Sequence, residues 1–134
     1  MAGYSETPLL KKLGLKEGFR IALVNSPEDF LTELGALPAN VHVLTHPVKP
    51  LDFIMLFVDD EKTLAKCFHA LAKKLTTDGM IWIAWPKKSS GVATDLSFEC
   101  VQRVGLESGL VDVKICAIDE IWSSLKFVYR LKDR

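Results

Sequence analysis

The segment Met80–Thr94, with the sequence MIWIAWPKKSSGVAT, joins an apolar strand to a basic loop. The run Met80–Trp85 is apolar throughout, as is typical of a strand covered on both faces of a sheet. Pro86 ends this strand, and a helix is predicted to begin at Thr94. In α/β proteins, ligands bind where a buried strand ends in a loop that precedes a helix. This segment therefore indicates an α/β fold and a candidate binding edge.

The composition of the chain fits one α/β domain, residues 1–134, with 49% hydrophobic and 25% charged residues. The formal net charge is zero, so nucleic acid is not an expected partner. No apolar run approaches the ~20 residues of a membrane span, and no membrane association is expected. The first residues lack the apolar core of a signal peptide. The three widely spaced cysteines favour a reduced, cytoplasmic environment.

Apolar segments and turn signals alternate along the whole chain. Strands are predicted at Phe19–Val24, Val41–Thr45, Leu51–Val58, Met80–Trp85, Leu110–Ile118 and Leu125–Leu131. Helices are predicted before Gly14, at Pro27–Gly35, from after Asp60 to Leu75, and at Thr94–Glu107. This alternation favours a mostly parallel sheet with helices on both faces. The last two strands are too close for a crossover helix and should form an antiparallel edge hairpin. The predicted fold is a three-layer Rossmann-like sandwich with a six-stranded sheet.

Four segments resemble the Rossmann-like methyltransferase fold over roughly the last two thirds of the chain. They are LDFIMLFVDD, LTTDGMIWIAWPK, ESGLVDVKIC and SSLKFVYRL, in that order. The resemblance implies a truncated methyltransferase fold. In those enzymes a glycine-rich loop after the first strand wraps S-adenosylmethionine, because glycine lets the backbone approach the ligand closely. Here the first strand ends in Val24–Asp29 (VNSPED), which has no glycine, so the sequence leaves the cofactor undefined.

Over its full length the chain also resembles a bacterial family of small proteins that has no established activity. Three segments carry this resemblance: Tyr4–Leu9, the Trp-Pro-Lys-Lys loop Trp85–Val92, and Asp119–Phe127. The resemblance implies no substrate and no catalytic residue.

The basic loop after Met80–Trp85 contains candidate ligand-binding residues. Two lysines supply positive charge, and two hydroxyls and a glycine N–H can donate hydrogen bonds. These residues are Lys87, Lys88, Ser89, Ser90 and Gly91. The expected ligand carries a phosphate or carboxylate group. The alternative is a solvated loop in which Thr94 or Asp95 caps a helix.

A second group of candidates lies between the last two strands. If those strands pair, Asp119 and Trp122 lie at a hairpin tip on the same edge of the sheet as the basic loop. Asp119 or Glu120 could then pair with Lys87 or Lys88, and Trp122 could form an aromatic wall for a planar ligand. Asn25 and Asp59, each at the end of a predicted strand, should converge on the same edge. The alternative to a ligand site is a salt bridge between the hairpin tip and the basic loop that only stabilises the fold.

These features predict a non-enzymatic domain that binds a small anionic ligand. One alternative is a protein-interaction module, which could self-associate through an exposed sheet edge. A second alternative is a divergent S-adenosylmethionine-dependent methyltransferase. Neither a metal-ligand spacing nor a catalytic triad is visible in the sequence, so no metal and no catalytic residue are assigned.

Overall fold

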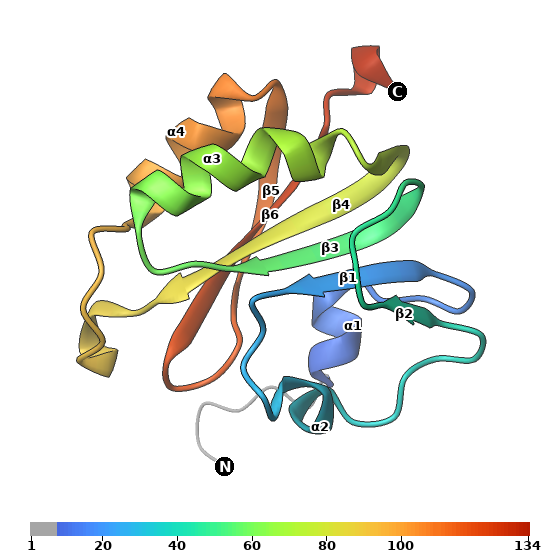
Figure 1. Cartoon of the computed structure of the whole chain (residues 1–134), viewed down its shortest axis with the longest axis horizontal. Helices are drawn as coiled ribbons and strands as arrows, with labels where there is room; N and C mark the ends of the chain where they lie inside the picture. The colour runs from blue at the N-terminus through green and yellow to red at the C-terminus, as the bar shows by residue number, and fades with distance from the viewer. Residues whose placement is uncertain (1–7) are drawn as a thin grey trace.

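A computed structural model describes residues 8–134, which form one mixed sheet with helices on both faces (Figure 1). The strands are β1 (Arg20–Val24), β2 (His42–Leu44), β3 (Leu51–Phe57), β4 (Leu75–Pro86), β5 (Leu110–Ala117) and β6 (Trp122–Tyr129). The α-helices are α1 (Leu9–Leu13), α2 (Phe30–Leu34), α3 (Glu61–Ala72) and α4 (Phe98–Glu107), and the short 3₁₀ helices are η1 (Lys88–Ser90) and η2 (Leu131–Asp133).

The strand order confirms the predicted mostly parallel sheet with an antiparallel hairpin at its edge. The order is β2-β1-β3-β4-β6-β5, with β2, β1, β3 and β4 parallel to one another. Strand β6 runs antiparallel to both β4 and β5. The chain leaves β1 toward β2 on one side and leaves β3 toward β4 on the other. The connections therefore diverge between β1 and β3, where α/β folds form ligand crevices.

Each face of the sheet has its own apolar core. Helices α3 and α4 cover one face, and α1 and α2 lie on the other (Figure 1). On the first face, the fully buried rings of Phe68 and Phe127 pack edge to face, with centroids 5.1 Å apart. On the second, the indole Nε1–H of the buried Trp82 donates a hydrogen bond of 2.9 Å to the Leu13 carbonyl and so ties α1 to β4.

Helix α4 begins later than the sequence predicted. Its first residue is Phe98, and the Ser97 hydroxyl caps it by accepting a hydrogen bond of 3.2 Å from the Cys100 N–H. The predicted start at Thr94 is wrong because the Thr94 hydroxyl instead donates to the Asp59 carbonyl at 2.6 Å. The chain from Gly91 to Ser97 therefore crosses toward the start of α3 before it becomes helical.

Helix α2 is also shorter than the predicted Pro27–Gly35. It begins at Phe30, and Asp29 in the capping position makes no side-chain hydrogen bond to the helix. Pro27 contributes a carbonyl that accepts from the Phe30 N–H, so it lies in the turn before the helix. The residues Asn25–Asp29 are therefore a loop at the carboxyl end of β1.

Strands β4 and β6 are longer than predicted. Leu75 already pairs with Leu51, so α3 ends at Ala72 instead of Leu75. Residues 76–79, which lie between the predicted helix and the predicted strand, form an irregular segment inside β4. Strand β6 begins at Trp122, which pairs with Pro86, and not at Leu125. Trp122 therefore belongs to the sheet and not to the connection before it.

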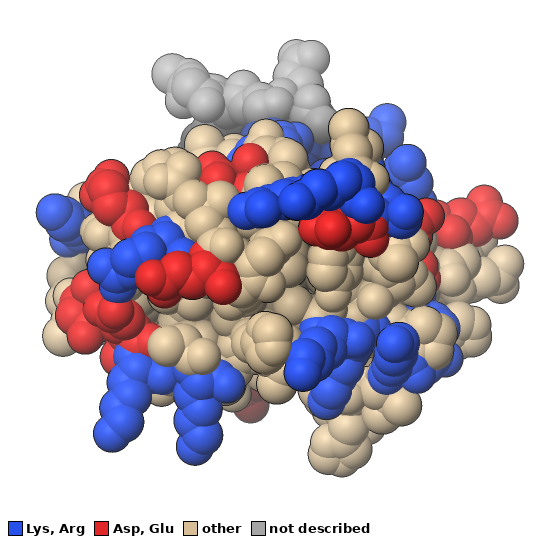
Figure 2. Space-filling view, turned by 90° about the horizontal axis from the view of Figure 1, so that it is seen from above, with Lys and Arg blue, Asp and Glu red and all other residues tan. Residues whose placement is uncertain are grey.

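Acidic and basic side chains are interspersed over most of the face seen from above in Figure 2, the side on which α3 and α4 lie. Within residues 8–134, no helix is long and apolar enough to cross a membrane.

Candidate functional site

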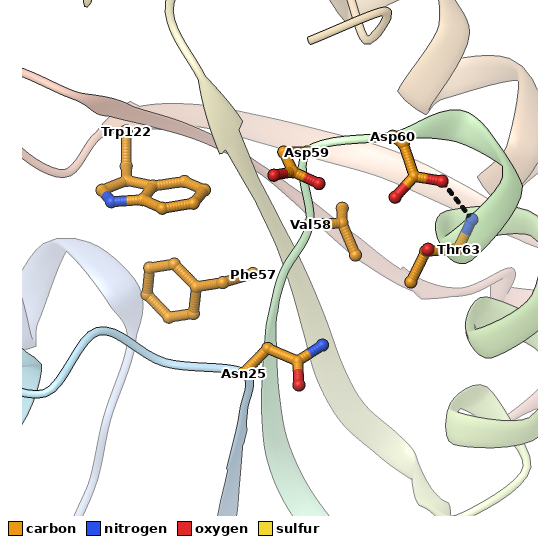
Figure 3. A pocket seen from close by; sticks show the side chains of 7 residues that line it. All are labelled: Asn25, Phe57, Val58, Asp59, Asp60, Thr63 and Trp122. Atoms are coloured by element: carbon orange, nitrogen blue, oxygen red, sulfur yellow. Dashed lines mark hydrogen bonds between the residues drawn. The ribbon is translucent and has the colours of Figure 1, made fainter. Parts of the chain in front are cut away.

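A cavity of about 340 Å³ lies at the carboxyl ends of β1 and β3 (Figure 3). Its lining consists of Asn25, Phe57, Val58, Asp59, Asp60, Thr63 and Trp122. This volume falls within the roughly 300–1,000 Å³ of small-molecule sites. The cavity coincides with the divergence of the chain between β1 and β3, where a ligand site is expected from the topology.

The turn from β3 to α3 gives the cavity an acidic side. Asp60 caps α3 by accepting a hydrogen bond of 2.9 Å from the Thr63 N–H. Hydrogen bonding to Thr63 lowers the pKa of the Asp60 carboxyl below its usual 3.8. The Asp59 carboxylate lies between Asp60 and the Trp122 ring in Figure 3. The lining contains two carboxylates and no lysine or arginine, so it is complementary to a cation.

The opposite side of the cavity is aromatic. The rings of Phe57 and Trp122 pack edge to face, with centroids 5.1 Å apart and an interplanar angle of 88°. Phe57 packs in the same way on Phe30 of α2, at 4.9 Å and 71°. Trp122 is only half-buried, so part of its indole remains available to a ligand. Carboxylates and aromatic rings thus face one another across the cavity.

Asn25 shows how the loop after β1 turns without a glycine. Its φ of 57° lies in the left-handed region, which glycine enters most readily and asparagine tolerates better than most residues. The sequence showed only that Val24–Asp29 lacks the glycine of a cofactor loop. In the structure, Asn25 adopts the left-handed conformation at the cavity itself.

The basic loop lies outside the cavity and is held by hydrogen bonds to the hairpin and within itself. Lys87 donates its backbone N–H to the Ile121 carbonyl at 2.7 Å, which ties the loop to the start of β6. The Ser90 hydroxyl donates to the Lys87 carbonyl at 2.6 Å and accepts from the Val92 N–H at 3.1 Å. Lys88 and Ser89 lie in η1, and Gly91 ends that turn with a φ of 80°. None of the five predicted loop residues lines the cavity.

Asp119 organises the hairpin tip and does not pair with the lysines. Its Oδ1 accepts from the Ile121 N–H at 2.9 Å and from the Trp122 N–H at 2.8 Å. In the described part of the chain, the one ion pair joins Arg103 to Glu61. The expected salt bridge from Asp119 or Glu120 to Lys87 or Lys88 is therefore not formed.

Glu33 is a neighbour of Asp119 that the sequence did not reveal. Partial burial, a hydrogen bond with Asp119 and the negative charges of Asp119 and Asp29 raise the pKa of Glu33 from its usual 4.5 to about 7. Glu33 lies on α2, far from the hairpin in sequence, and no local pattern marks such a pair. Phe57 and Thr63 were also missed. Their places at the end of a predicted strand and in the first turn of a predicted helix were the available signal.

No model of a protein family matches this chain, and no curated protein matches it in sequence. Solved structures do resemble it. A SAM dependent methyltransferase from Aquifex aeolicus aligns with a TM-score of 0.62 and 16% identity, over 88% of this chain and 86% of that one. Magnesium protoporphyrin IX methyltransferase from Synechocystis PCC 6803, with bound SAH, gives 0.61 and 12% identity over 91% and 78%. Aeropyrum pernix fibrillarin, with natively bound S-adenosyl-L-methionine, gives 0.60 and 15% over 94% and 70%.

The chain therefore has a methyltransferase-like Rossmann fold. The prediction of a non-enzymatic, anion-binding domain is wrong. The similar structures are consistently S-adenosylmethionine-dependent methyltransferases, which favours the second alternative drawn from the sequence. The site gives a physical reason for the error, because the lysines on which the prediction rested lie outside an acidic cavity.

Proposed function

We propose that this chain is a divergent methyltransferase that binds S-adenosylmethionine in the cavity between Asn25 and Trp122. One observation carries the proposal: the cavity lies where the connections after β1 and β3 diverge, and Asn25 gives the loop there the left-handed turn expected of glycine. The same fold holds S-adenosyl-L-methionine in the fibrillarin structure.

The lining of the cavity suits this cofactor chemically. Its sulfonium is a cation, which the carboxylates of Asp59 and Asp60 would attract. Its adenine is planar and could stack on the exposed part of the Trp122 indole. Phe57 and Trp122 would also attract the sulfonium through their ring faces. When bound, S-adenosylmethionine supplies an electrophilic methyl group.

Asp59 is the residue of this chain best placed to assist the transfer. Methylation of an O–H or N–H group forms a bond between that atom and the methyl carbon, while the electron pair of the broken C–S bond remains on sulfur. The O–H or N–H proton must then leave, and the Asp59 carboxylate would accept it. Thr94, through its hydrogen bond to the Asp59 carbonyl, would hold this turn in place.

Calorimetric titration with S-adenosylmethionine and S-adenosylhomocysteine tests the proposal. We expect Asp59→Asn to weaken S-adenosylmethionine binding about tenfold, a loss of about 1.4 kcal/mol. The neutral sulfur of S-adenosylhomocysteine should make its binding less sensitive to this change. We expect Trp122→Ala to weaken both ligands by about 0.5–1.5 kcal/mol through lost stacking. Lys87→Ala is the matched control and should bind like the wild type. No binding by the wild type at millimolar ligand would overturn the proposal.

We also propose that the chain is related to the bacterial small-protein family that it resembles. Two of the segments that carry this resemblance, Trp85–Val92 and Asp119–Phe127, lie side by side through the Lys87–Ile121 hydrogen bond and the pairing of β4 with β6. A cytoplasmic location is proposed because all three cysteines are free thiols, as a reducing compartment favours.

A further inference from the structure

We infer that Asp119 is a positioning residue, which keeps Trp122 in place as a wall of the cavity. A proton shared between Glu33 and Asp119 regulates the position of Trp122. The inference builds on the proposed function, because it names residues that regulate the same cavity. The side chains of Glu33 and Asp119 do not line the cavity themselves.

The first step is the contact between Asp119 and the start of β6. The Asp119 carboxylate accepts two backbone hydrogen bonds, from Ile121 at 2.9 Å and from Trp122 at 2.8 Å. The Trp122 carbonyl in turn accepts from the Ile118 N–H at 2.9 Å, which closes the hairpin. The carboxylate therefore helps to fix the backbone at Trp122, together with the pairing of Trp122 with Pro86. Since the indole lines the cavity, the shape of the cavity depends on it as well.

The second step is the contact between Asp119 and α2. Helix α2 packs on the hairpin, because its Phe30 and Leu34 share one buried cluster with Ile118. Glu33 lies on this helix, and its side chain meets that of Asp119 through a hydrogen bond. Two carboxyl groups can do this only when one of them carries a proton. The Asp119 carboxylate already accepts from two N–H groups, and the raised pKa belongs to Glu33, so Glu33 is the partner that holds the proton. The charged groups that act on Glu33 are Asp119 on the hairpin and Asp29 before α2.

The third step is the aromatic contact that runs beside this carboxyl pair. Phe30 of α2 packs on Phe57, and Phe57 packs on Trp122, so α2 and the hairpin are joined through the cavity wall. If the carboxyl pair separates, the hairpin loses this polar contact with α2, while the apolar packing around Phe57 and Trp122 remains.

The chemistry predicts the direction of the response to pH. At low pH the protonated Glu33 donates to the Asp119 carboxylate and holds the hairpin on α2. Burial, Asp119 and Asp29 raise the pKa of Glu33 to about 7, so above that pH both groups are negative and repel each other. Trp122 should then occupy the position that completes the cavity in a smaller fraction of molecules. The apparent affinity for the ligand should fall in proportion to that fraction.

Four variants distinguish the effect of the Glu33–Asp119 pair from the effect of losing an acidic side chain elsewhere. Glu33→Gln replaces the proton donor with an amide that can donate to Asp119 at every pH. Asp119→Asn keeps an oxygen for the two backbone N–H groups but removes the charge pair. Asp119→Ala removes the acceptor itself. Glu28→Gln is the matched control, because Glu28 is an exposed acid beside the same helix.

The first measurement needs no ligand. NMR follows the indole N–H signal of Trp122, assigned with Trp122→Phe, as the pH rises from about 5 to about 9. We expect this signal to titrate near the pKa of Glu33 in the wild type and in Glu28→Gln, and to lose that transition in Glu33→Gln and Asp119→Asn. The inference is overturned if the wild type shows no transition there, or if Glu33→Gln shows the same transition.

The second measurement is calorimetric titration with S-adenosylhomocysteine. We expect the wild-type Kd to rise about three- to tenfold more than that of Glu33→Gln between about pH 6 and about pH 8.5. Titration of the ligand itself affects both proteins equally and cancels in this ratio. Asp119→Ala should bind more weakly than Asp119→Asn at both pH values, and equal affinities would overturn the positioning role. If the wild type binds at neither pH, the proposed function fails, while the NMR titration still decides the inference.

Discussion

The hydroxyl of Thr94 donates a hydrogen bond of 2.6 Å to the backbone carbonyl of Asp59. This contact joins the segment before α4 to the acidic side of the cavity. A second contact strengthens it, because the Asp95 carboxylate accepts from the Glu61 N–H at 2.8 Å and caps α3 from outside that helix. The turn that bears the two cavity carboxylates is therefore held by a distant part of the chain.

Thr94→Val tests this contact. The substitution removes the donor to Asp59 and the acceptor for the Leu96 N–H, so we expect a loss of about 1–2 kcal/mol in the free energy of unfolding. Urea denaturation measures it. Thr77→Val is the matched control, since Thr77 is exposed on β4, and it should change stability by less than about 0.5 kcal/mol. Equal stability of the two variants would show that the contact contributes nothing.

Gly105→Ala should destabilise the protein although alanine is the better helix former by about 1 kcal/mol. A Cβ at this position would lie 2.0 Å from Cε2 of Phe127, which is fully buried and packs on Phe68. Such overpacking costs about 1–3 kcal/mol in a well-packed core. Thermal or urea unfolding measures the change. Glu107→Ala, at an exposed position of the same helix, should be close to neutral, and a neutral Gly105→Ala would contradict the tight packing.

Much of the fold followed from apolar runs that the sequence shows directly. The run Leu51–Val58 predicted a strand covered on both faces, and the structure buries nearly all of it at the centre of the sheet. The close spacing of the last two strands predicted their antiparallel pairing. Helix starts were harder to place, because Thr94 and Ser97 are both good caps by type. Only the tertiary contact to Asp59 decides between them.

The site was less accessible to sequence reasoning. Asn25 and Asp59 were expected at this edge because they follow predicted strands, and Trp122 because it lies between the last two predicted strands. All three line the cavity. The lysine loop was predicted as a site because its residue types suit an anion. In the structure it lies outside the cavity, and its serine bonds to its own backbone. The contact between Glu33 and Asp119 arises only from the packing of α2 against the hairpin, so no local pattern could reveal it.

A pair of substitutions at Asn25 tests the left-handed turn beside the cavity. We expect Asn25→Ala to lose about 1–2 kcal/mol in the free energy of unfolding, since alanine tolerates the left-handed region less well than asparagine. Asn25→Gly should stay close to the wild type, because glycine adopts this φ without strain. Urea denaturation compares the two, and equal stability of the Ala and Gly variants would show that the turn relaxes.

The stability of the protein should fall as the pH rises through the range set by Glu33. The pKa of this group is 4.5 when unperturbed and about 7 in the folded protein, so between these values the folded state binds more protons than the unfolded state. Its contribution is thus complete below about pH 4.5 and is lost as the pH approaches about 7. Because Glu33 is largely exposed, we expect a loss of only about 1 kcal/mol.

Urea denaturation at a series of pH values measures this loss as the difference between the wild type and Glu33→Gln. The wild-type curve should fall relative to the variant between about pH 4.5 and about pH 7 and run parallel to it above. Taking the difference removes the contributions of the other acids, which titrate alike in both proteins. Glu28→Gln should follow the wild type throughout. Parallel curves for the wild type and Glu33→Gln over the whole range would mean that Glu33 ionises as freely in the folded chain as in the unfolded one.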